Sequence, residues 1–145
     1  MVNQIIKEHI NWYSNAAKAG FIAVRRPFVS RVLSNLSEQE IISLAEYVAK
    51  AANKDAILLI EREYTIKSAF DFLESWIKIS GYSYRHEEIN NGQNKHSYVI
   101  QHDIGVKWSI YLASLYQFLF DELGQSKKIE FDKTENTLAF TIYSD

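Results

Sequence analysis

The chain has 145 residues, which is enough for one domain with a sizeable core. Apolar residues make up 47% of it and aromatic residues 14%, which excludes a disordered chain. There is no Cys, so disulfides and thiolate chemistry are excluded, and this suits a reducing cytoplasm. No apolar run reaches the roughly 20 residues needed to span a bilayer, and no signal peptide opens the sequence. We therefore expect a cytoplasmic protein with no membrane partner.

The net charge of -2 hides an uneven distribution of charge. Up to Asn35 there are five basic residues and one acid, so the rest of the chain carries eleven basic residues and seventeen acids. A basic N-terminal part can bind an anionic partner. Arg25, Arg26 and Arg31 are the candidate anion-binding residues, because guanidinium groups contact phosphate and carboxylate with two hydrogen bonds. The alternative is a solvated helix face with a chance excess of charge.

The first helix is predicted from Val2 to Ala17, where apolar positions recur at intervals of three and four. They form a narrow stripe of Ile5, Ile6, His9, Ile10, Tyr13 and Ala17. A narrow stripe usually pairs with another helix, either in the same chain or in a partner. Residues 1–19 are therefore the expected dimerisation arm of a homodimer.

Gly20 should end this helix, and residues 21–24 should be extended. Pro27 should lie in the first turn of a short second helix.

Ser37 with Glu40 has the spacing of a capping box and predicts the start of a third helix. Its expected inward residues are Ile41, Leu44, Ala45, Val48 and Ala52. Residues 53–55 are expected to break or kink it, and we favour helix again for 56–60.

Ser68 with Asp71 has the same spacing and predicts the cap of another helix, which Gly81 should close. The expected inward face consists of Ala69, Phe70, Leu73, Trp76 and Ile77.

After Gly81 the hydrophobic period changes to two, which indicates a β-hairpin over 82–103 with a turn at 90–92. A strict two-residue turn would put Tyr84 opposite Val99, whereas a loop one residue longer would put Tyr84 opposite Ile100. We favour the longer loop, because it gathers the aromatic and histidine rings on one face.

The most apolar helix should follow, with Asp103 as its cap, Gly105 at a sharp turn and Gly124 at its end. Its apolar residues cover more than half of its circumference, which predicts burial on two sides. They are Trp108, Tyr111, Leu112, Leu115, Phe118 and Leu119.

Residues 127–131 and 137–143 are then predicted to form a second hairpin. Its expected inward residues are Ile129, Phe131, Leu138, Phe140 and Ile142. The predicted fold class is α+β, in which N-terminal helices precede a ββαββ unit whose four-stranded antiparallel sheet packs on a central buried helix. Residues 1–145 are expected to form one domain.

The segment HSYVIQHDIGVKW, preceded by SAFDFLESWIKISGYSY and followed by KIEFDKTENTLAF, resembles the C-terminal domain of uncharacterised archaeal proteins that carry an N-terminal ribbon-helix-helix segment. The resemblance covers nearly the whole chain and implies a lineage of transcription regulators. Ribbon-helix-helix proteins read the DNA major groove with paired strands that precede two helices. Met1 would fall inside the second of those helices, so the resemblance argues against direct sequence-specific DNA binding by this chain.

Aromatic and polar side chains around the central helix could line a small-molecule pocket between that helix and the sheet. The candidate ligand-binding residues are Tyr84, His86, Tyr98, His102, Lys107, Trp108 and Tyr111. The alternative is that these side chains only pack in the core.

Neutral histidines can bind a transition metal or haem iron. The candidate metal ligands are His86, His96 and His102, but their spacing matches no standard ligand motif. We therefore expect no bound metal and no cofactor.

The sequence has no recognisable Ser/His/Asp set, no paired carboxylates and no phosphate-binding glycine loop. We therefore predict a non-enzymatic regulatory or small-ligand-sensing domain that forms a homodimer. Two alternatives remain open: a nucleic-acid-associated regulator that uses the basic N-terminal part, and a metal- or haem-binding sensor.

Overall fold

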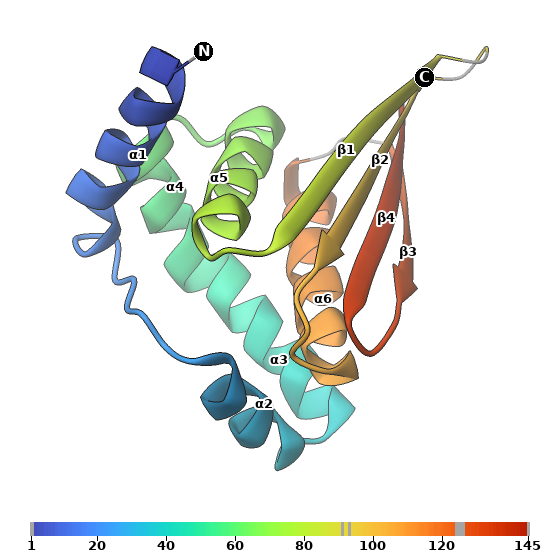
Figure 1. The fold of residues 1–145 in the computed structure, drawn as a ribbon. Helices are drawn as coiled ribbons and strands as arrows, with labels where there is room; N and C mark the ends of the chain where they lie inside the picture. The colour runs from blue at the N-terminus through green and yellow to red at the C-terminus, as the bar shows by residue number, and fades with distance from the viewer. Residues whose placement is uncertain (1, 91, 93, 124–126, 145) are drawn as a thin grey trace.

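The computed structural model describes residues 2–90, 92, 94–123 and 127–144, and it has the predicted α+β class. Helices α1 to α5 come first, and strands β1 and β2, helix α6 and strands β3 and β4 follow (Figure 1). The order of helices followed by a ββαββ unit is therefore confirmed.

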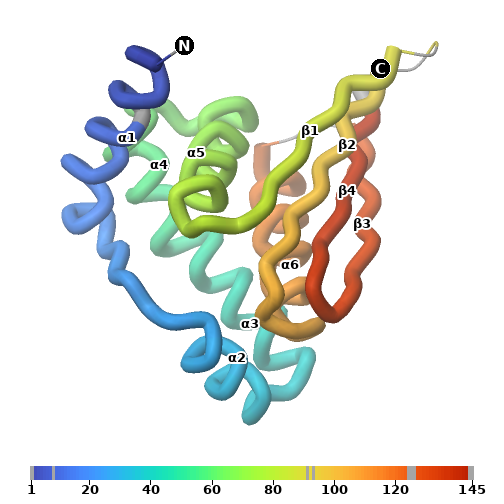
Figure 2. The backbone as a smooth tube through the Cα atoms, in the orientation of Figure 1, coloured from blue at the N-terminus to red at the C-terminus, as the bar shows by residue number. Residues whose placement is uncertain are grey.

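Helix α1 (Val2–Ala16) ends close to the predicted position. A turn at Gly20 and the segment of residues 21–25 then lead to α2 (Arg26–Ser34), and we call residues 20–25 the strap (Figure 2). Pro27 lies in the first turn of α2, as predicted, because its missing N–H is not needed there.

The third helical run consists of α3 (Glu38–Tyr47), the π-helical turn η1 (Val48–Asn53) and α4 (Lys54–Glu61). The capping box at its start is confirmed. Ser37 Oγ accepts a hydrogen bond from the Glu40 N–H at 3.2 Å, and the Glu40 carboxylate accepts one from the Ser37 N–H at 2.6 Å.

The predicted inward face of this run was wrong at Leu44 and Ala52, which are exposed. The buried face instead continues from Ala45 to Ala49 and Asn53, four residues apart at each step. The π-helical turn keeps residues at this spacing on one face of the run, so Leu44 and Ala52 lie beside the buried face. The helical run continues through residues 53–55 without a break.

The predicted cap of α5 (Ile66–Ile79) was also wrong. Thr65, not Ser68, is the N-cap residue, and Ser68 is the third residue of the helix. The Thr65 N–H donates to Ser68 Oγ at 2.8 Å, while the Ser68 N–H donates to Thr65 Oγ1 at 3.2 Å. The helix therefore starts earlier than expected, and Asp71 forms an ion pair with Lys67 instead.

The four strands are β1 (Ser83–Asn90), β2 (Asn94–Gln101), β3 (Lys128–Lys133) and β4 (Thr137–Ser144). They form one antiparallel sheet in the order β1-β2-β4-β3. Tyr84 is paired with Ile100, which confirms the longer hairpin loop. Asn91 of the expected turn lies outside the described residues.

Helix α6 (Val106–Leu123) lies between the sheet and α3, as the prediction of burial on two sides requires (Figure 1). Asp103 does not cap it, because Asp103 lies three residues before the helix and has a φ of 57°. The Gly105 carbonyl accepts the N–H groups of Trp108 and Ser109 at 3.0 and 3.4 Å, so Gly105 occupies the cap position. Gly124, the expected end of the helix, lies outside the described residues.

Aromatic rings fill the interface between the sheet and the helices. Phe140 of β4 is stacked on Tyr98 of β2 with ring centroids 4.7 Å apart, and it lies 4.5 Å from Tyr116 of α6. Phe70 of α5 contacts the same three rings. The side chains at this interface therefore pack as core, which was the alternative to a pocket there.

Helix α1 contacts α4 and α5, and its buried residue is Trp12. The predicted stripe has no partner helix in the described part of the chain, because its isoleucines and Tyr13 are 49–65% exposed.

Candidate ligand-binding pocket

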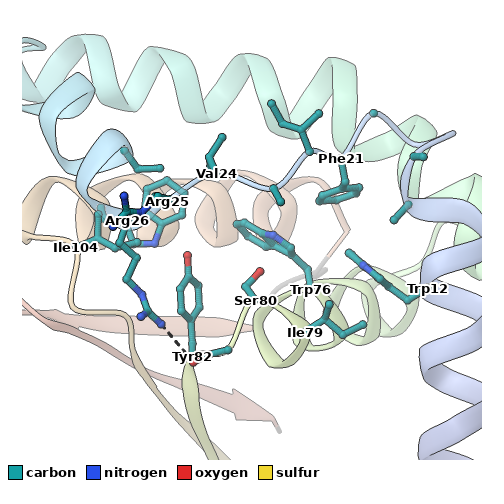
Figure 3. A pocket seen from close by; sticks show the side chains of 18 of the residues that line it. Trp12, Phe21, Val24, Arg25, Arg26, Trp76, Ile79, Ser80, Tyr82 and Ile104 are labelled. Carbon is teal, nitrogen blue, oxygen red and sulfur yellow. Dashed lines mark hydrogen bonds between the residues drawn. The ribbon is translucent and has the colours of Figure 1, made fainter.

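A cavity of about 1270 Å³ lies on the helical side of the molecule, beneath the strap (Figure 3). Its walls come from the end of α1, the strap, the start of α2, the end of α5 with residues 80–82, and the start of α6. Because these segments are far apart in the sequence, the pocket exists only in the folded chain.

The strap crosses the pocket because it is held at its two ends. At the first end, Gly20 has a φ of 88°, which reverses the chain after α1, and the Phe21 N–H donates to the Ala16 carbonyl at 2.9 Å. At the second end, Arg26 Nη2 donates to the Gly81 carbonyl at 3.3 Å. Between these ends the strap is exposed, and Ile22 is 82% exposed.

Aromatic side chains form the wall of the pocket, and they include all three tryptophans of the chain. Phe21 lies 4.9 Å from Trp12 and 6.5 Å from Trp76, measured between ring centroids. Trp76 in turn lies 6.3 Å from Trp108, edge to face. These rings form a continuous apolar wall, and Figure 3 shows Trp76 and Tyr82 directed towards the strap.

The polar groups of the pocket are concentrated at the end near α2 and α6. The Arg26 guanidinium lies over the Tyr82 ring, 5.7 Å from its centroid. The Trp108 indole N–H is buried and makes no hydrogen bond, although it lies close to the Tyr82 hydroxyl. Burial raises the pKa of Tyr82, while Trp108 and Arg26 act in the opposite direction, so this hydroxyl stays protonated at neutral pH.

Three of the candidate residues from the sequence meet at this pocket, namely Arg25, Arg26 and Trp108. Arg31 does not line it, because it lies on the exposed surface of α2. Tyr111 is stacked behind Trp108 with ring centroids 4.8 Å apart, and burial raises its pKa to about 12.

His102 does not line the pocket. Its ring is buried, and both ring nitrogens form hydrogen bonds within a buried network. Its Nδ1 accepts the Ile104 N–H at 3.0 Å, so the other nitrogen, Nε2, carries the proton and donates to Ser109 Oγ at 2.7 Å. Ser109 Oγ then donates to the Thr134 carbonyl at 2.7 Å. His102 therefore joins the start of α6 to the β3–β4 turn and has no free nitrogen for a ligand or metal.

Lys107 is likewise occupied outside the pocket. Its Nζ donates to the carbonyls of Ser34, at 3.1 Å, and Leu36. Lys107 thus ties α6 to the C-terminal end of α2, where a cation is favourable.

Tyr84, His86 and Tyr98 form a separate group on the inner face of the sheet. His86 is stacked on Tyr98 with ring centroids 4.4 Å apart, and its Nε2 lies 3.1 Å from His96 Nδ1. Burial is the main cause that raises the pKa of Tyr84 and Tyr98. No group of three or more potential metal ligands is assembled within the described residues.

Sequence reasoning missed Trp12 and Phe21, and it assigned Trp76 to the core face of α5. Trp12 lies outside the apolar stripe of α1, and Phe21 lies in a segment without periodicity. The three tryptophans were the feature of the sequence that could have indicated these residues, since large aromatic side chains commonly line small-molecule sites. Their meeting at one cavity depends on tertiary structure.

A second cavity of about 670 Å³ lies between α1, α4 and α5. Four of its charged groups are already paired, because Lys67 binds Asp71 and Lys78 binds Glu74, and the carboxylate of Glu61 faces the first of these ion pairs. It therefore has less to offer a ligand than the pocket beneath the strap.

The fold and the pocket together define an α+β domain with an aromatic cavity between its helices. Comparisons with protein-family models, curated proteins and solved structures found no match. Within the described residues, none of the helices has the length and apolarity required to cross a membrane.

Proposed function

We propose that this chain is a non-enzymatic regulatory domain that senses a small molecule in the pocket beneath the strap. The observation that carries the proposal is the aromatic pocket itself, which is lined by all three tryptophans and by Phe21 and is large enough for a small organic ligand.

The chemistry of the lining favours binding over catalysis. Among the described residues that line the pocket there is no Asp, Glu, His, Lys or Cys. These residue types supply most general acids, general bases and nucleophiles in enzymes. Aromatic and aliphatic side chains with two arginines are suited to holding a molecule rather than transforming it.

The position of the pocket favours a regulatory role. The strap connects α1, whose apolar stripe is exposed, to the rest of the fold. A ligand beneath the strap would contact both the strap and the end of α1, and it would thereby bias the orientation of α1. If α1 pairs with its copy in a homodimer, ligand binding and dimer geometry are coupled. The resemblance to transcription regulators, in which a helix of this kind continues from the DNA-binding unit, supports the same role.

The three tryptophans provide the readout for a direct test. The neutral probe N-phenyl-1-naphthylamine should bind with saturable energy transfer from tryptophan, because Trp12, Trp76 and Trp108 all contact the cavity. Ala16→Phe places a ring at the wall of the pocket and should weaken probe binding at least about fivefold, while thermal unfolding confirms that the variant folds.

Ala51→Phe is the matched control, because Ala51 is exposed on η1 and does not line the pocket. It should bind the probe like the unmodified protein. The proposal fails if the probe shows no saturable binding, or if Ala16→Phe and Ala51→Phe bind it equally well.

A further inference from the structure

We propose that the ligand of this pocket is an apolar molecule that carries an anionic group, such as a carboxylate, and that this group binds between Arg25, Arg26, Tyr82 and Trp108. This inference rests on the proposed function, because it names the chemical class that the same pocket selects.

The first argument is the charge of the lining. Arg25 and Arg26 are the only charged residues among the described residues that line the pocket, so its formal charge is positive. Both arginines are exposed to solvent at the rim of the apolar wall, so they attract an anion to the mouth of the pocket. A cationic ligand is disfavoured in this position, although aromatic rings alone would attract one.

The second argument is the direction of the hydrogen-bonding groups. Guanidinium and indole N–H groups can only donate, and the buried Trp108 N–H makes no hydrogen bond of normal geometry, although the Tyr82 hydroxyl lies beside it. The Arg26 guanidinium uses one of its nitrogens for the Gly81 carbonyl at 3.3 Å and has further N–H groups to offer. The Tyr82 hydroxyl can also donate. A ligand that satisfies these groups must bring acceptors, and a carboxylate brings the most per atom.

The third argument is the N-terminus of α2, which lies in the same wall. Arg25 is its N-cap residue and makes no side-chain capping hydrogen bond, and the first turn contains no acidic residue. The partial positive charge of this helix end is therefore not compensated from within the helix. It adds to the field of the two guanidinium groups.

The apolar part of the ligand would then extend from this end along the ring wall. Trp108 lies at the charged end, Trp76 comes next, and Phe21 and Trp12 follow. Aromatic and aliphatic bodies both fit such a wall, so the shared chemistry is an amphipathic anion.

Two probes with the same ring system test the anionic group. 1-Anilinonaphthalene-8-sulfonate differs from N-phenyl-1-naphthylamine by a single sulfonate. The unmodified protein should bind the sulfonate probe about tenfold or more tighter than the neutral one. The double variant Arg25→Gln/Arg26→Gln should lose this preference and keep its affinity for the neutral probe.

Arg31→Gln is the matched control, because Arg31 is an exposed arginine of the same region that does not line the pocket. It should bind both probes like the unmodified protein, and near-ultraviolet circular dichroism should show an intact fold in every variant. Competition by decanoate and by naphthalene-2-carboxylate then shows whether the pocket accepts a carboxylate with an aliphatic or an aromatic body. Displacement by either carboxylate supports the inference.

The outcomes separate the two proposals. Equal affinity for the two probes in the unmodified protein overturns the anionic class and leaves the pocket as a binding site. The same conclusion follows if Arg31→Gln changes the preference as much as the double variant does. If neither probe binds, the inference and the proposed function both fall.

Discussion

At the scale of single residues, His102 determines how the sheet and the central helix meet. Its ring is fully buried, and it accepts one hydrogen bond and donates another within a network that reaches the Thr134 carbonyl. A protonated ring would direct an Nδ1–H against the Ile104 N–H, so two donors would face each other. The network therefore requires neutral His102.

The stability of the fold should depend on pH through this side chain. Burial, assisted by Arg26 and opposed by Asp103, lowers the pKa of His102 from 6.5 to about 4. Below pH 6.5 the unfolded chain binds a proton that the folded chain excludes, so stability falls as the pH drops from 6.5 towards 4. We expect a loss on the order of 2 kcal/mol from this residue, measured by urea unfolding between pH 7 and pH 4.5.

His102→Gln removes the titrating group, so it should flatten this part of the pH profile and lower the stability at pH 7. His9→Gln, which replaces an exposed histidine of α1, is the control for the loss of a histidine elsewhere in the chain. A profile that His102→Gln shifts downwards without a change of slope would contradict the assignment.

At the scale of elements, α1 is a helix that the rest of the chain covers on only a narrow side. It is attached through Trp12, while Ile5, Ile6, Ile10 and Tyr13 stay 49–65% exposed. Complete burial of a fully exposed isoleucine contributes about 1.5–3 kcal/mol, so burial of the exposed half of each of these side chains contributes roughly half of that. Several such residues on each copy can together hold two copies of the chain.

We expect sedimentation velocity to show a dimer of the unmodified chain. Ile10→Glu should convert it mainly to monomer, because Ile10 lies within the stripe and a carboxylate would be buried at the interface. Ile22→Glu introduces the same change at an 82% exposed position of the strap and should stay dimeric. A monomer in all three cases would show that the stripe has another role.

The two capping boxes illustrate where sequence reasoning succeeds and where it does not. Ser37 with Glu40 was predicted correctly, although Asn35 with Glu38 has the same spacing two residues earlier. Around Ser68 there were two possibilities, since Thr65 and Ser68 are three residues apart, as are Ser68 and Asp71. Tertiary structure decided between them, because Ser68 is buried and also donates to the Glu63 carbonyl at 2.9 Å.

At the scale of the whole molecule, the fold class was predictable and the pocket was not. The hairpins and the central helix follow from local periodicity. The register of the first hairpin, in which Tyr84 pairs with Ile100, was predicted from the expectation that the rings lie on one face of the sheet. The pocket brings together the ends of α1 and α5 with the start of α6, and no local pattern encodes that meeting. Arg25, Arg26 and Trp108 were identified as candidates by their chemistry, but they were assigned to two different sites.

The shared position of α6 leads to a prediction about how the molecule unfolds. Leu112, Leu115 and Leu119 are buried in the helix that contacts both α3 and the sheet, so neither layer has a complete core without it. We therefore expect residues 1–145 to unfold as one cooperative unit in urea.

Tryptophan fluorescence reports the helical side, because all three tryptophans line the pocket there, and the amide NMR signals of β2 and β4 report the sheet. The two midpoints should coincide in the unmodified chain, and they should move together in Leu115→Ala, which should cost about 2–5 kcal/mol because it leaves a cavity in the shared core. Val32→Ala, a truncation at a 44% exposed position of α2, should shift both midpoints much less. A sheet that keeps its amide signals after the tryptophans have become exposed would instead divide the chain into two units.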